Sequence, residues 1–107
     1  MTEQASQLTQ ALIKQVEQLS SLAVLLEKEL QLISSRDAES LMNLLDEKTA
    51  LLTSIQALDG SIERTISDQG SMSEEDDALM ANAKKLLDDC KYRTQVNQKA
   101  VEQGQLR

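Results

Sequence analysis

Aliphatic side chains recur at alternating steps of three and four residues along three long stretches of this chain. The first stretch runs from about residue 2 to residue 33, and its apolar positions are Leu12, Val16, Leu19, Ala23, Leu26, Leu30 and Ile33. Such steps place side chains on one face of an α-helix, and the sequence contains no proline to break it. The pattern predicts long amphipathic helices that pack along heptad seams.

Two more helices are predicted, at residues 37–68 and 74–104. The seam of the second comprises Leu41, Leu44, Leu51, Ile55, Leu58 and Ile62. The seam of the third begins with Leu79, Ala83, Leu86 and Cys90. Apolar residues beside each seam widen the stripe beyond the need of a two-stranded coiled coil, and short connections favour antiparallel neighbours. We expect one all-α domain over residues 1–107, an elongated antiparallel bundle of three long helices with coiled-coil-like packing.

Turn and cap residues support these boundaries. Asp37 can cap the second helix by accepting from a free amide of its first turn. Gly70 suits a left-handed helix end, and Ser73 to Asp76 resemble a capping box for the third helix. Gly60 lies inside the second stretch, but the apolar pattern resumes after it, so we expect that helix to continue.

Three seam residues carry specific expectations. Leu51 and Ile55 should be buried because both lie on the apolar face of the second helix. Lys48 lies on the same face, and we expect its stem to follow the apolar surface while its ammonium group reaches water. Cys90, the single cysteine, should act as a small apolar residue.

Composition disfavours several classes of function. The chain has no histidine, one aromatic residue and a net charge of −7, so we expect no enzyme, no metal site, no cofactor and no nucleic-acid partner. The acidic run at 74–77 suits the dipole of a helix start and lacks the spacing of a calcium loop. The first residues lack the apolar stretch of a signal peptide, which predicts a cytoplasmic protein without stable membrane insertion.

The third predicted seam loses its large apolar residues after Cys90, while residues 90–107 carry a net charge of +3. This change indicates either a frayed helix end or a surface that awaits a partner helix, where small residues allow close approach. The candidate partner-binding residues are Arg93, Val96, Asn97, Ala100, Val101 and Gly104.

Residues 47–58, EKTALLTSIQAL, resemble the FlgN family of flagellar export chaperones, in which an E-K-x-x-L-L-x-x-L/I-x-x-L pattern is typical of the second long helix. The resemblance extends to Leu26, Glu29 and Leu30 on the first helix, and to the polar stretch from Cys90 to Asn97. It therefore covers most of the chain.

This resemblance implies a cytosolic chaperone that holds the hook-filament junction proteins FlgK and FlgL, through their carboxyl-terminal helical segments, before type III secretion. It implies the export gate as a further partner, and it maps substrate capture to residues 90–107, with Val96, Asn97, Ala100 and Val101 as candidates. The residues alone fit a second function equally well, that of a helical-bundle adaptor linking protein partners. A monomer and a dimer are both compatible with the widened stripe.

Overall fold

The computed structural model describes residues 6–104, which form three α-helices and no strand. The helices are α1 at Gln7–Ser34, α2 at Ala38–Gln69 and α3 at Glu74–Glu102. The predicted all-α class is confirmed. The predicted start of the first helix at residue 2 lies outside the described residues, and α1 begins where the Ser6 hydroxyl accepts from the backbone amide of Thr9.

The described part of the chain is elongated, with extents of 56 × 23 × 21 Å. Hydrogen bonds fix the helix directions. The Gln15 amide donates to Asp59, and the Glu29 carboxylate accepts from Lys48. The later residue of α1 thus pairs with the earlier residue of α2, so the two helices run antiparallel. The Leu19 carbonyl accepts from the Cys90 thiol, and the Leu26 carbonyl accepts from the Asn97 amide. The two residues of each pair are 71 residues apart in sequence, and this constant separation means that α1 and α3 run parallel.

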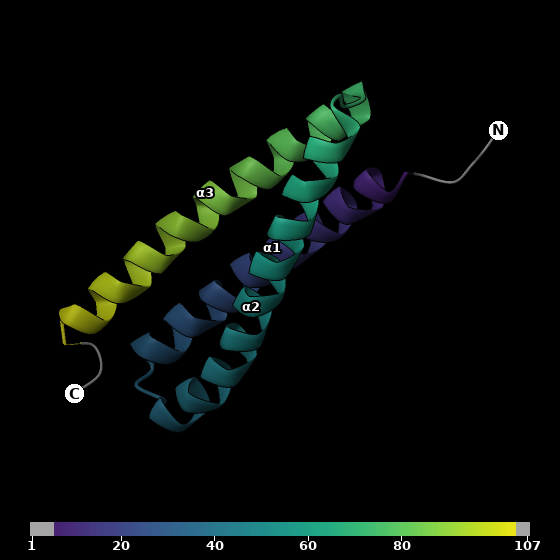
Figure 1. Cartoon of the computed structure of the whole chain (residues 1–107). Coiled ribbons are helices and arrows are strands. Elements are labelled where there is room, and N and C mark those ends of the chain that lie inside the picture. The colour runs from purple at the N-terminus through teal and green to yellow at the C-terminus, as the bar shows by residue number, and fades with distance from the viewer. Residues whose placement is uncertain (1–5, 105–107) are drawn as a thin grey trace.

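Helix α1 is the centre of the bundle, because it packs against both other helices. Within residues 6–104, no Cα atom of α2 comes within 8 Å of a Cα atom of α3. Figure 1 shows α2 and α3 meeting at the 70–73 turn and diverging from it. The bundle is therefore open on one side, which the heptad pattern did not predict.

The core has two clusters, both built on α1. Leu8 and Leu12 pack with Ile62 near the 70–73 turn, and Leu22 and Leu26 pack with Cys90 farther along. Only Leu44 and Ile62 of α2 are fully buried.

The prediction for two residues of α2 is wrong in degree. Leu51 and Ile55 touch the second cluster but are only half-buried. The physical reason is the open architecture: α2 has one neighbouring helix instead of two, so α1 alone covers its seam.

The predicted capping residues Asp37, Gly70 and Ser73 are confirmed, whereas the Asp76 carboxylate bonds to α1 and not back to Ser73 as a full capping box requires. Asp37 accepts from the backbone amide of Ser40, and this bond lowers the pKa of the Asp37 carboxyl, with the Ser40 hydroxyl adding to the effect. Gly70 ends α2 in the left-handed conformation, and Ser73 caps α3 by accepting from the amide of Asp76. The Asp76 carboxylate itself accepts from the Thr9 hydroxyl on α1, at 2.6 Å, so it joins two helices.

Gly60 within α2 and Gly70 at its C-cap give a first prediction, in which alanine at the two positions has opposite effects on stability. Gly70 has φ +81°, which an L side chain rarely adopts, so Gly70→Ala should lower the free energy of unfolding by about 1 kcal/mol. Gly60 lies within the helix, where an added Cβ would meet only a flexible arginine at 3.7 Å. Gly60→Ala should therefore raise the free energy of unfolding by about 0.5–1 kcal/mol. Urea unfolding followed by circular dichroism measures both, and equal signs would contradict this account.

Candidate functional site

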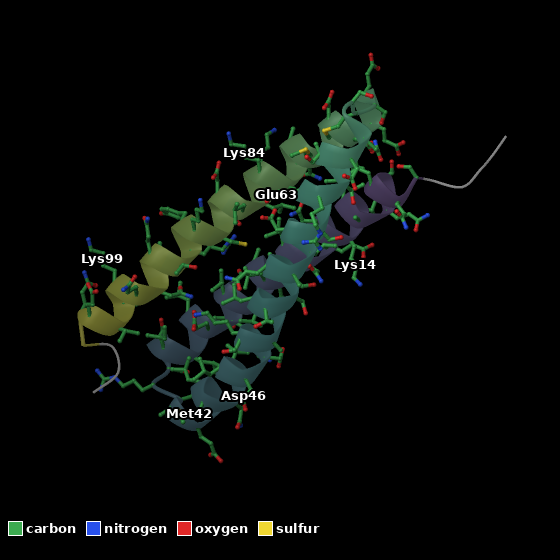
Figure 2. The ribbon with its side chains drawn as sticks, in the orientation of Figure 1. Lys14, Met42, Asp46, Glu63, Lys84 and Lys99 are labelled. Atoms are coloured by element: carbon green, nitrogen blue, oxygen red, sulfur yellow. The ribbon has the colours of Figure 1, made fainter. Side chains whose placement is uncertain are left out.

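The divergence of α2 and α3 leaves a groove that has α1 as its floor. At the wide end, a depression of about 570 Å³ has residues from all three helices in its lining, namely Glu29, Ile33, Lys48, Thr94, Asn97, Gln98, Val101 and Glu102. Figure 2 labels Met42 and Lys99, which mark the α2 and α3 sides of this end. We name this feature, between α2 and α3 over α1, the open groove.

A polar network lies at the wide end of the open groove. Asn97 is only 5% exposed, and its amide nitrogen donates to the Leu26 carbonyl at 2.9 Å and to Glu29 Oε1 at 2.7 Å. The other oxygen of Glu29 accepts from Lys48 Nζ at 3.0 Å. One carboxylate on α1 thus holds both α2 and α3, and partial burial strengthens these bonds relative to water.

The expectation for Lys48 is wrong in its main point. Its ammonium group pairs with Glu29 instead of ending in water, and the side chain is half-buried. Glu29 was named only for the family resemblance, and its pairing with Lys48 was not predicted, because only apolar residues were assigned to the first seam. The sequence did contain a signal for this ion pair: Lys48 on α2 and Glu29 on α1 have opposite charges and lie on the facing sides of two antiparallel helices.

The structure divides the six predicted partner-binding residues between two sides of α3. Arg93 and Val96 line a smaller depression of about 230 Å³ against α1, on the other side of α3 from the open groove. Val101 lies in the open groove, and Asn97 borders both depressions. Ala100 and Gly104 are half-buried and line neither depression. The six residues therefore do not form one continuous surface.

The seam of α3 continues past Cys90 in a polar form. Residues 93, 97, 100 and 104 follow at steps of four and three, and each is buried or half-buried. Asn97 occupies a position where an apolar seam would carry leucine. The end of α3 is thus packed on α1 through hydrogen bonds, and the change in the sequence after Cys90 reflects this polar contact.

Two other predicted features have structural roles. Cys90 is buried and its thiol donates to the Leu19 carbonyl at 3.5 Å, which confirms it as a small seam residue. Burial, followed by the nearby Asp89 carboxylate, raises the pKa of this thiol and keeps it protonated. Arg93 donates to Asp89 one turn earlier at 2.9 Å, and this hydrogen bond raises the pKa of Arg93.

The acidic start of α3 has one inward member. Asp76 is buried against Thr9, whereas Glu74, Glu75 and Asp77 are exposed. Residues 6–104 contain no group of three metal-ligating side chains of the cysteine or carboxylate type placed to hold an ion. None of the helices in the described range has an apolar stretch long enough to cross a membrane.

An open three-helix bundle with a depression at its wide end defines a helical protein with a surface suited to protein binding. A comparison with family models matches residues 1–107 to the family described as FlgN protein. The match covers the whole chain, so the protein belongs to the FlgN family and is a flagellar export chaperone. No curated protein and no solved structure matches the chain.

Proposed function

We propose that this protein acts in the cytoplasm and binds the carboxyl-terminal helical segments of the hook-filament junction proteins FlgK and FlgL before type III secretion. Membership of the FlgN family, over the whole chain, is the observation that carries this proposal. A chaperone that covers a helix of its cargo prevents that helix from pairing with other proteins. The affinity of the chaperone for the cargo determines what fraction of the cargo is protected.

The carboxyl-terminal part of α3 is the proposed place of capture. Val101 is exposed and Val96 is half-buried, so both offer apolar surface to a partner. Ala100 and Gly104 are small but lie on the seam that packs against α1, so they support the end of α3 from inside. Arg93 can pair with an acid of the cargo in place of Asp89. Asn97 acts from inside the bundle, because its amide already bonds to α1, and it positions α3 instead of contacting the cargo directly.

Titration calorimetry with carboxyl-terminal fragments of FlgK and FlgL tests the proposal as a second prediction. Val96→Glu and Val101→Glu should each weaken binding at least tenfold, since a buried unpaired carboxylate in a helix contact is costly. Val24→Glu is the matched control, because Val24 is exposed and lines a depression formed by α1 and α2 alone. Its variant should bind within about twofold of the unmodified protein. An unmodified protein that binds neither fragment would overturn the proposed function.

A further inference from the structure

The last part of α3, residues 91–104, is attached to α1 differently from the rest of that helix. We call it the α3 end segment; it is the yellow end of α3 in Figure 1. Helix α3 contributes Leu79 to the first core cluster and Cys90 to the second, and no described residue after Cys90 belongs to either. In the end segment, the one fully buried side chain is Asn97. Apolar clusters therefore hold the start of α3, whereas a polar residue holds its end.

The contact between the α3 end segment and α1 is narrow. Depressions of about 230 and 570 Å³ lie on its two sides, and Asn97 borders both of them. Val96 is half-buried beside the smaller depression, and Val101 is 44% exposed beside the larger one. A hydrogen bond adds little net stability because water offers the same bonds to the separated groups. We therefore expect the end segment to separate from α1 more readily than the rest of α3.

The surface of α1 beneath the α3 end segment is apolar. Leu26 is 1% and Ile33 is 2% exposed, and Leu30 is half-buried. Leu26 and Leu30 line the smaller depression beside Asn97, and Ile33 lines the larger one. A helix with leucine at the place of Asn97 would bury more apolar surface against α1 than the end segment does.

We infer that the α3 end segment is a releasable cover on α1, and that an amphipathic helix of the exported cargo takes its place. This inference rests on the proposed function and names the surface of the capture site that lies beneath α3. The bound helix presents large apolar side chains, three and four residues apart, to Leu26, Leu30 and Ile33. The released segment remains attached to α3 beside the cargo, where Val96 and Val101 can pack against the bound helix.

A cargo helix suits this surface better than a second copy of the chain does. The α3 helix of a second copy carries the same Asn97, so exchange of end segments between two copies would bring no additional apolar contact to α1. A cargo helix with leucine at that place brings this contact. Because the end segment competes with the cargo, the measured affinity is the intrinsic affinity reduced by the fraction of molecules in which the segment is released.

Asn97→Ala distinguishes a releasable cover from a support. The substitution removes both hydrogen bonds to α1, so a larger fraction of molecules has the end segment released. Calorimetry with the FlgK carboxyl-terminal fragment should show binding at least threefold tighter, although the variant is less stable. Gln95→Ala is the matched control, since Gln95 is an exposed amide of α3 and its variant should bind like the unmodified protein. Unchanged or weaker binding by a folded Asn97→Ala variant would overturn the inference.

Thiol labelling gives a second measurement that does not depend on Asn97→Ala. In Leu30→Cys, a maleimide should label the introduced thiol at least tenfold more slowly when the FlgK fragment saturates the protein. Peptide mass spectrometry separates this thiol from the buried Cys90. Val24→Cys is the control, because Val24 is exposed and lines a depression of α1 and α2 alone, so the fragment should not change its labelling rate.

The outcomes separate this inference from the function on which it rests. If Val96→Glu loses binding while the fragment leaves the labelling of Leu30→Cys unchanged, the cargo does not cover α1, and the proposed function stands without the releasable cover. If the unmodified protein binds no fragment, the proposed function fails. Labelling of Leu30→Cys that slows as the protein concentration rises, without any fragment, would place a second copy on this surface and overturn the cargo as its occupant.

Discussion

Replacement of Leu26 by alanine should lower the free energy of unfolding by about 3–5 kcal/mol. Leu26 is 1% exposed and packs with Leu22 and Cys90. Helix α1 is the only contact between α2 and α3 along most of the molecule, so a cavity beside Leu26 weakens the packing on which the bundle depends. Urea unfolding followed by circular dichroism measures the loss.

Val24→Ala is the matched control for this prediction. Val24 lies two residues earlier on the same helix and is 66% exposed. Removal of its two methyl groups leaves no cavity, so the free energy of unfolding should change by less than about 0.5 kcal/mol. A loss below about 1 kcal/mol for Leu26→Ala would mean that the second core cluster contributes little to stability.

The helices of this protein are predictable because their signals are local. The three- and four-residue steps of leucine and the absence of proline predict three long helices. Asp37, Gly70 and Ser73 mark their ends through contacts within four residues along the chain. Each of these signals can be evaluated in a single turn of helix.

The arrangement of the helices depends on contacts distant in sequence, and the pattern did not predict it. The apolar face of α2 would suit a closed bundle as well as an open one. Leu51 is half-buried only because α3 diverges from α2. A closed bundle would have covered Leu45 and Leu52 too, but both leucines are exposed.

The candidate site was predicted in part. Sequence reasoning identified the end of α3 as unusual because its seam turns polar after Cys90, and that region does border the open groove through Val101. It did not predict that Asn97 faces inward, because the hydrogen-bond partner of Asn97 is Glu29, 68 residues away in sequence. Lys48 and Asn97 are polar residues on otherwise apolar seams, and this pattern was the sequence signal that both bond to a common partner, Glu29.

The polar network explains how the wide end of the groove keeps its shape. Leucine contacts are non-directional and would let α2 and α3 close together over α1. Glu29 instead fixes one donor on each side, Lys48 on α2 at 3.0 Å and Asn97 on α3 at 2.7 Å. Such paired polar groups specify one arrangement of helices more than they add stability. The network therefore fixes the positions of α2 and α3 on α1 at the wide end.

Asn97→Asp tests this role and should lower the free energy of unfolding at pH 7 by about 3 kcal/mol. The substitution removes the amide that donates to Leu26 and Glu29, and it places a second carboxylate beside Glu29 in a buried position. A neighbouring like charge favours the protonated form in the folded state, so the folded variant binds more protons than the unfolded chain. Its stability should therefore rise as the pH falls from 7 toward about 4.5.

Gln98→Glu is the matched control, since it makes the same amide-to-acid change at the next residue. Gln98 is exposed, so its variant should stay within about 0.5 kcal/mol of the unmodified protein at pH 7. Thermal unfolding of both variants between pH 7 and about 4.5 measures the difference. Equal stability of the two variants across this range would show that Asn97 does not hold α3 to α1. A large loss confined to Asn97→Asp, recovered by acid, would identify the Glu29 contact as its cause.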